Sequence, residues 1–229
     1  MPMPTESQIH PLKDGSLTIY KDGRHQYWTD DDTTKRPSVT TLTSYLSGDS
    51  FSAGVGYAVK QLNMGVDPKA STKDAAEEGN QLHADIETFI KSDGRTIAEN
   101  PLFTSFYHEI GNLNWIASEL FIYNPELLYG GTVDAIALSG DTQIWDFKTV
   151  NPESWEKYGS SLRKVKDSAQ LAGYALALES MSSIYDIGQG YIAYILRDGS
   201  AVAIEPVDLD WGRKLFLGSK TVYDTIKGK

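Results

Sequence analysis

Apolar and polar residues alternate along two neighbouring stretches in the middle of the chain. Residues 132–138 and 142–149 are rich in β-branched and aromatic side chains, and the polar sequence Ser139-Gly140-Asp141 separates them. A period of two is typical of strands, and a short linker containing glycine is typical of a hairpin turn. The sequence therefore predicts an antiparallel hairpin centred on Gly140, preceded by a third strand at residues 115–123.

Helical periodicity dominates the flanking sequence, where apolar residues recur every three or four positions. Helices are predicted near residues 38–47, 52–64, 72–92, 100–113 and 168–180, and after Asp208. Two more hairpins are predicted, at residues 17–28 about Asp22-Gly23 and at residues 190–207 about Asp198-Gly199. Helices before and after a central sheet predict an α/β fold of mixed α+β character, with a central mixed β-sheet flanked by helices.

Composition fits one domain, because 229 residues of which 40% are apolar and 11% aromatic form a sizeable core without disulfides. We expect an N-terminal hairpin and helical part at residues 1–114 and a catalytic core at residues 115–229 of the same domain. The sequence has no long apolar run and no basic leader, and it contains no cysteine. These features predict a soluble, cytoplasmic protein without a membrane segment.

The central hairpin carries the residues with the clearest chemistry. If the turn is centred on Gly140, Asp134 lies across from Asp146, and Asp146 and Lys148 share the same face of the sheet. Two facing carboxylates repel one another unless a cation lies between them, and hard divalent ions prefer oxygen ligands. The trio predicts metal-dependent phosphodiester chemistry, with Lys148 facing the reacting phosphate. The alternative is an ordinary solvated strand face, because an Asp-x-Lys sequence alone is a weak motif.

A polar pair lies on the predicted helix at residues 168–180. Gln170 and Tyr174 are one helical turn apart, so both side chains project from the same face. They are either ordinary polar positions at the edge of a helix or part of the site built on the hairpin.

Taken in order, these residues resemble a family pattern. The chain contains Gly79-x-x-x-His83, then Glu119, Gly131-x-x-Asp134, Asp146-x-Lys148 and Gln170-x-x-x-Tyr174. This order resembles the RecB-type branch of the PD-(D/E)XK nuclease superfamily. The segment Arg36-Pro37-Ser38-Val39-Thr40-Thr41-Leu42 is similar to a Pro-Ser-Val-Thr segment of the mitochondrial genome maintenance exonuclease and related phage exonucleases.

The resemblance implies a restriction-endonuclease-like core that cleaves DNA with Mg²⁺ or Mn²⁺, commonly as an exonuclease on single strands. It further implies a bacterial or phage role in DNA repair, recombination or replication, with replication or recombination proteins as possible partners. Members that carry an iron-sulfur cluster hold it with cysteines, so a chain without cysteine does not belong to that type.

The resemblance also assigns roles to individual residues. His83, Asp134, Asp146 and Glu119 become candidate metal ligands, although His83 taken alone is more typical of a structural residue. Glu119 would ligate a second metal or hold a metal-bound water, and the equal alternative is an exposed edge-strand charge that deters aggregation. Gln170 and Tyr174 are expected to orient Lys148 or to grip the phosphate backbone.

Net charge argues against nucleic-acid binding, because the chain has 21 Lys and Arg residues against 31 Asp and Glu residues, a formal charge of -10. One local segment is basic and aromatic, and it follows the hairpin directly. We predict that it contacts phosphates and stacks on bases, with a solvated helix face as the alternative. Its predicted nucleic-acid-binding residues are Trp155, Lys157, Arg163, Lys164 and Lys166.

Three other functions stay open at this point. A nuclease-like fold can bind DNA without cutting it, as a processing subunit, and an open cleft would make a structure-specific endonuclease. A glycosidase also uses two carboxylates, but Lys148 and the Gln170 helix have no role in that reaction.

Overall fold

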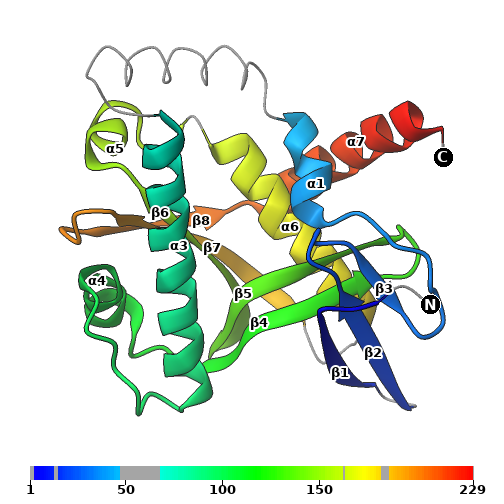
Figure 1. The fold of residues 1–229 in the computed structure, drawn as a ribbon, viewed down its shortest axis with the longest axis horizontal. Coiled ribbons are helices and arrows are strands. Elements are labelled where there is room, and N and C mark those ends of the chain that lie inside the picture. Colours follow the sequence, from blue (N-terminus) through cyan, green and yellow to red (C-terminus); the bar gives the residue numbers. More distant parts are fainter. Residues whose placement is uncertain (1–2, 13–14, 47–67, 162, 182–185, 229) are drawn as a thin grey trace.

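A computed structural model describes residues 3–12, 15–46, 68–161, 163–181 and 186–228 (Figure 1). The predicted helix at residues 52–64 lies outside the described residues. Within them, no helix is long and apolar enough to cross a membrane.

A five-stranded sheet forms the centre of the molecule, in the order β4-β5-β6-β7-β8. Its strands are β4 Trp115–Asn124, β5 Tyr129–Ser139, β6 Asp141–Val150, β7 Ile187–Leu196 and β8 Val202–Val207. Strands β6 and β7 are parallel, whereas the other neighbours are antiparallel. Parallel neighbours need a crossover connection, and helix α6 (Lys164–Met181) provides it. The predicted central mixed sheet flanked by helices is therefore confirmed.

Helices cover both faces of the central sheet (Figure 1). On one face, α3 (Pro68–Lys91) and α4 (Pro101–Ile110) bury Leu82 and Phe106 against Trp145 and Phe147 of β6. On the other, α6 packs with α1 (Val39–Thr43) and α7 (Leu209–Lys227) around a second apolar cluster. Alternate residues of β6 therefore enter different cores, as the period of a strand requires.

Helix boundaries differ from the predicted ones where caps decide them. The side chain of Ser38 accepts a hydrogen bond at the start of α1, and α1 ends at Thr43, where a short 3₁₀ turn (Ser44–Leu46) continues it. Helix α3 begins at Pro68, before the predicted residue 72. Helix α4 ends at Ile110 rather than at residue 113, and Asp208 caps α7 as its predicted start implies. A short helix, α5 (Pro152–Tyr158), follows β6.

A small N-terminal sheet packs against strands β4 and β5. Its strands are β1 (Glu6–Leu12), β2 (Gly15–Lys21) and β3 (Tyr27–Thr29), all antiparallel. The predicted hairpin corresponds to β2 and β3, whereas the pattern gave no sign of β1. Ile19 and Tyr27 bury their side chains against Phe121 and Tyr123 of β4, which joins the two sheets.

Candidate active site

The hairpin of β5 and β6 has the predicted register. Ser139 pairs with Asp141 around Gly140, whose φ of 77° is one that glycine adopts easily, and Ala135 pairs with Trp145. The ladder ends there, one step before Asp134 and Asp146. Instead, the backbone N–H of Phe147 donates to the Asp134 carboxylate at 2.8 Å. Asp134 is thus held at the point where the two strands separate.

Strand β4 is also irregular beside Asp134. Ser118 pairs with Ala135 and Leu120 with Val133, so Glu119 stands opposite Asp134 in register, but no pairing joins these two residues. Glu119 has a φ of 48°, in the left-handed region that residues with a side chain rarely adopt. Such backbone strain persists only where surrounding contacts enforce it, and it is frequent in functional sites.

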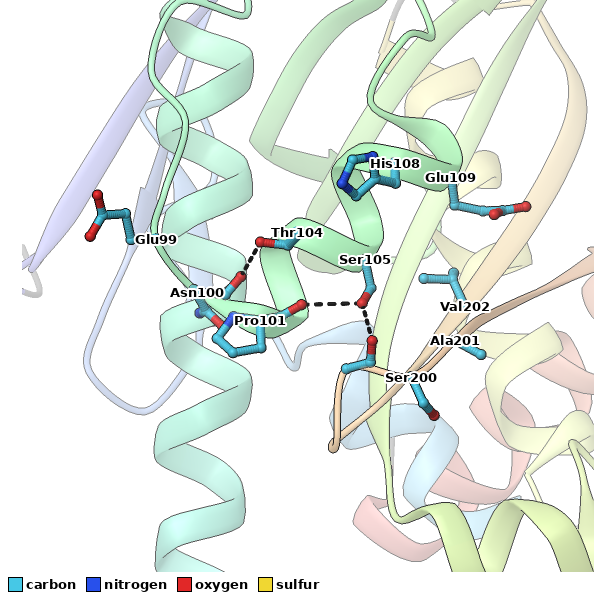
Figure 2. Close-up of a pocket in the computed structure, with 11 residues that line it drawn as sticks. Glu99, Asn100, Pro101, Thr104, Ser105, His108, Glu109, Ser200, Ala201 and Val202 are labelled. Carbon is cyan, nitrogen blue, oxygen red and sulfur yellow. Dashed lines mark hydrogen bonds between the residues drawn. The ribbon is translucent and has the colours of Figure 1, made fainter.

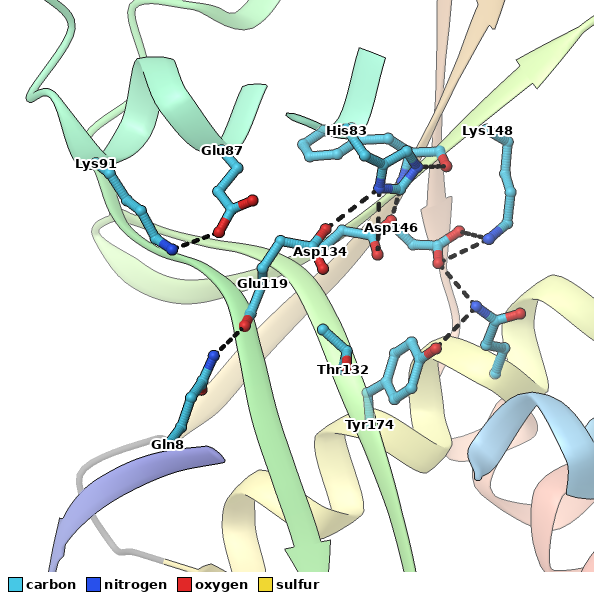
Figure 3. A network of polar contacts seen from close by, with 12 residues as sticks. Gln8, His83, Glu87, Lys91, Glu119, Thr132, Asp134, Asp146, Lys148 and Tyr174 are labelled. Atoms are coloured by element: carbon cyan, nitrogen blue, oxygen red, sulfur yellow. Dashed lines mark hydrogen bonds and ion pairs between the residues drawn. The ribbon is translucent and has the colours of Figure 1, made fainter. Parts of the chain in front are cut away.

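His83 on α3 meets both carboxylates (Figure 3). Its Nδ1 lies 3.4 Å from Glu119 Oε1 and 3.8 Å from Asp134 Oδ1. Its Nε2 lies 3.1 Å from the carbonyl oxygen of Phe147. If Nε2 donates to that carbonyl, Nδ1 presents its lone pair to the space between the carboxylates, as a metal ligand does.

The electrostatics of this group favour a cation. Burial lowers the pKa of His83, but the Asp134 and Glu119 carboxylates outweigh that effect and raise the pKa to about 9. One ligand atom from each of these three residues lies within 4.8 Å of the others, an arrangement that could hold a metal ion. The donor set of one imidazole and two carboxylates suits Mn²⁺, and its oxygens suit Mg²⁺. The three residues therefore fit a divalent ion.

Asp146 lies beside this group and has different neighbours. It is fully buried, and its Oδ1 accepts hydrogen bonds from Lys148 Nζ at 2.9 Å and from Gln170 Nε2 at 3.0 Å. Its Oδ2 lies 2.7 Å from Lys148 Nζ as an ion pair, but among the described residues it has no hydrogen bond of good geometry. A buried carboxylate oxygen without a hydrogen bond of good geometry is suited to contact a further group, such as a metal ion.

The charges of Asp146 and Lys148 depend on each other. Burial raises the pKa of Asp146, Lys148 lowers it, Asp134 raises it again, and the net pKa is above the usual value. Burial alone would lower the pKa of Lys148, but Asp146 and Asp134 raise it above its usual range. Lys148 is therefore a cation at neutral pH, with about a quarter of its side chain exposed. It is suited to hold an anion and not to act as a general base.

Gln170 and Tyr174 reach the site from α6, as predicted. Gln170 Nε2 donates both to Asp146 and, at 3.1 Å, to the hydroxyl of Tyr174. The ring of Tyr174 lies on Gly131, where an added Cβ would stand only 2.8 Å from ring atom Cε1. Gly131 therefore makes room for Tyr174, which gives a physical reason for the glycine in the Gly-x-x-Asp segment. Gly79, in contrast, has ordinary space beside Thr149 of β6, at 3.5 Å.

Asp167 is a buried residue of the site region that the sequence patterns did not indicate. It accepts a hydrogen bond from the Tyr194 hydroxyl at 2.9 Å, and Tyr194 pairs with Lys148 across β6 and β7. Burial raises the pKa of Asp167, and the charge of Lys148 opposes that effect. One signal was present in the sequence, because Asp167 precedes Gln170 by three positions and so shares its helix face.

The predicted nucleic-acid-binding residues divide between α5 and the start of α6. Lys157, Arg163 and Lys164 are exposed and Lys166 is partly exposed. Lysines in the first turn of a helix oppose its dipole, so Lys164 and Lys166 do not stabilise α6 there. Trp155 is half-buried, with its ring 4.9 Å from that of Tyr194, which gives it a packing role.

A separate cavity of about 580 Å³ lies between α4 and the turn that joins β7 to β8 (Figure 2). Glu99, His108 and Glu109 contribute to its lining, and Ser105 Oγ donates to the carbonyl oxygen of Gly199 at 2.5 Å across it. The residues that line this cavity include none of those predicted to form the active site.

Comparison with known proteins gives structural likenesses alone. No family model matches the chain, and no curated protein matches it. A crystal structure of SSO0001 has a TM-score of 0.42 and 18% identity, covering 84% of this chain and 75% of that one. The crystal structure of LHK-Exo in complex with dAMP has a TM-score of 0.45 and 12% identity, covering 84% and 88%. No function follows from likenesses at these scores.

Proposed function

We propose that the protein is a metal-dependent deoxyribonuclease that hydrolyses phosphodiester bonds as an exonuclease, with single-stranded DNA as its substrate. One observation carries this proposal: His83, Glu119 and Asp134 come from three segments and converge beside the buried pair of Asp146 and Lys148. The carboxylates of Glu119, Asp134 and Asp146 favour positive partners, and Lys148 supplies one of them. A divalent ion held by His83, Glu119 and Asp134 would supply another, and Lys148 beside it would bind the phosphodiester anion.

In this proposal, each residue of the site has one task. His83, Glu119 and Asp134 would hold Mg²⁺ or Mn²⁺, with Asp146 Oδ2 as a further contact. The bound ion would polarise the phosphate and lower the pKa of a water molecule. Lys148 binds a phosphate oxygen and offsets the negative charge that develops as the water attacks.

Gln170 and Tyr174 act on Asp146 and not on the substrate. The Gln170 amide fixes one oxygen of Asp146, and Tyr174 in turn fixes the position of Gln170. Asp146 thereby keeps Lys148 at the edge of the metal site. Four basic residues on α5 and at the start of α6 are exposed or partly exposed and would bind the DNA backbone: Lys157, Arg163, Lys164 and Lys166.

The test is digestion of end-labelled linear single-stranded DNA beside the circular form, with Mg²⁺ or Mn²⁺ and with a chelator. We expect degradation of the linear form alone, and loss of activity with the chelator or in Lys148→Ala. Lys73→Ala is the matched control, because Lys73 is on α3 with 76% of its side chain exposed. Cleavage of circles would indicate an endonuclease, and binding without cleavage under either metal would refute the catalytic proposal.

A further inference from the structure

The strained peptide at Glu119 lies on an edge strand. Strand β4 is the first strand of the central sheet, so only one of its sides pairs with β5. On its other side, the backbone N–H and C=O groups of Glu119 and its neighbours have no partner strand in the central sheet. The left-handed φ of Glu119 interrupts even the pairing with β5. Some other group has to hold the backbone in this shape.

That group is the side-chain amide of Gln8 on β1. Its Nε2 donates to the carbonyl oxygen of Glu119 at 2.7 Å, and its Oε1 accepts from the N–H of Phe121 at 2.7 Å. A residue of a parallel neighbour strand makes the same two bonds, one to a carbonyl and one to the N–H two positions later. Gln8 thus takes the place of a neighbouring strand where β4 is distorted (Figure 3).

The position of Gln8 is itself fixed on the core. Strand β1 pairs with β2 along its whole length, and β2 pairs with β3. From β3, the hydroxyl of Tyr27 forms a hydrogen bond with Thr132 Oγ1 at 2.9 Å. The Cβ and Cγ atoms of Tyr27 pack directly on Gly130, where an added Cβ would clash with them. The small sheet is therefore anchored to β5 as well as to β4. This anchoring fixes the position of Gln8 relative to β4.

We propose that Gln8 is a positioning residue of the metal site, which holds the backbone of Glu119 so that its carboxylate faces His83 and Asp134. This inference rests on the proposed role of Glu119 as a metal ligand. Without the Gln8 bonds, the left-handed φ of Glu119 loses the two hydrogen bonds that hold it, and β4 relaxes toward ordinary extended geometry. The Glu119 carboxylate then leaves the position from which it meets His83 and Asp134. The N-terminal sheet thereby becomes part of the metal site without contributing a ligand.

The test measures metal binding directly, so it does not depend on nuclease activity. Mn²⁺ affinity of the full chain is measured by electron paramagnetic resonance for the wild type, Gln8→Ala, Gln8→Glu and Glu119→Gln. Gln8→Glu keeps an acceptor for Phe121 but loses the donor to Glu119. Removing a group that supports a metal ligand weakens metal binding about 10- to 100-fold, and we expect this range for Gln8→Ala. Ile9→Ala is the control, because Ile9 is the next residue of β1 and is 72% exposed.

The outcomes separate the two proposals. Weaker Mn²⁺ binding in Gln8→Ala and Gln8→Glu, with normal binding in Ile9→Ala, supports the inference. Faster hydrogen exchange at the Phe121 amide of the folded variant would show that the expected bond is lost. If folded Gln8→Ala binds Mn²⁺ with wild-type affinity while Glu119→Gln binds it more weakly, the role of Gln8 is refuted and the metal site stands. Absence of Mn²⁺ binding by the wild type refutes the metal site and the inference with it.

Discussion

Replacement of Gly131 by alanine tests the link between strand β5 and helix α6. The added Cβ would lie 2.8 Å from Cε1 and 3.1 Å from Cδ1 of Tyr174. Carbon atoms pack best at about 3.5 to 4.0 Å, so the ring has to move by about 1 Å. Tyr174 is only 4% exposed, and no open solvent lies beside it to accept the ring.

The expected stability change combines two opposite effects. Overpacking of a core costs about 1 to 3 kcal/mol, whereas alanine in place of glycine stabilises by about 0.4 to 1 kcal/mol through the unfolded chain. We expect Gly131→Ala to lower the free energy of unfolding by about 1 to 2 kcal/mol. A ring shift of this size also disturbs the bonds from Gln170 to Tyr174 and to Asp146. The proposed nuclease activity should therefore fall by about 10- to 100-fold.

Urea unfolding and digestion of labelled DNA measure the two effects. The same substitution is then made in a Tyr174→Leu background, where the smaller side chain removes the close contact. In the Tyr174→Leu background, we expect Gly131→Ala to lower the free energy of unfolding by less than about 0.5 kcal/mol. This double-mutant cycle should therefore give a coupling free energy of about 1 kcal/mol between Gly131 and Tyr174. Gly218→Ala on α7 is the control, since its Cβ meets nothing within 4 Å and the helix should gain about 0.5 to 1 kcal/mol. An equal cost in both backgrounds would refute the reasoning.

Three further predictions concern other parts of the molecule. Burial alone would raise the pKa of Asp32, but hydrogen bonds from the Arg36 guanidinium and from a tyrosine hydroxyl hold it well below its usual range. Asp32→Asn should therefore lower the free energy of unfolding by about 1 to 2 kcal/mol at pH 7. Because the pKa of Asp32 is lower in the folded than in the unfolded protein, this difference between wild type and variant should shrink as the pH falls below about 4. A difference that stays constant in urea unfolding from pH 7 to pH 3 would contradict this assignment. Lys164→Ala should weaken the binding of single-stranded DNA, measured by fluorescence anisotropy at several salt concentrations. The negative slope of log affinity against log salt should become shallower by about 0.7, and an unchanged slope would exclude a phosphate contact by Lys164. Tyr129→Phe removes a buried 2.7 Å hydrogen bond to a helix carbonyl and should cost about 1 kcal/mol in urea unfolding, whereas wild-type stability would show that this bond contributes nothing.

Local patterns predicted the parts of the fold that depend on short-range chemistry. The turn at Gly140 and the alternation on either side of it fixed the register of β5 and β6, which agrees with the structure as far as Ala135 and Trp145. Helical spacing correctly placed Gln170 and Tyr174 on one face of α6. There Gln170 contacts Asp146, and Tyr174 contacts Gln170. The sequence order of the motifs then indicated which residues would meet.

The remaining parts of the site depend on contacts that no local pattern contains. Gln8 bonds to a residue 111 positions away, and its own strand β1 has no alternation that would single it out. The left-handed turn at Glu119 interrupts a segment that reads as a regular strand. Asp167 lies before the predicted helix at residues 168–180, and its hydrogen-bond partner Tyr194 belongs to the distant strand β7.

The parallel pairing of β6 with β7 also sets the order in which the molecule is completed during synthesis. Strand β6 carries Lys148, but its second neighbour is made only after the whole of α6. Gln8 precedes β4 in the chain and can bond to Glu119 only after β4 has been made. Distant pairings of this kind form late, because loop closure precedes them. We expect a nascent chain that has passed Lys148 but not β7 to contain every proposed metal ligand and still hold none of them in place. Under the proposed function, we therefore expect such an incomplete chain to bind no metal and to cleave no DNA until β7 has been made.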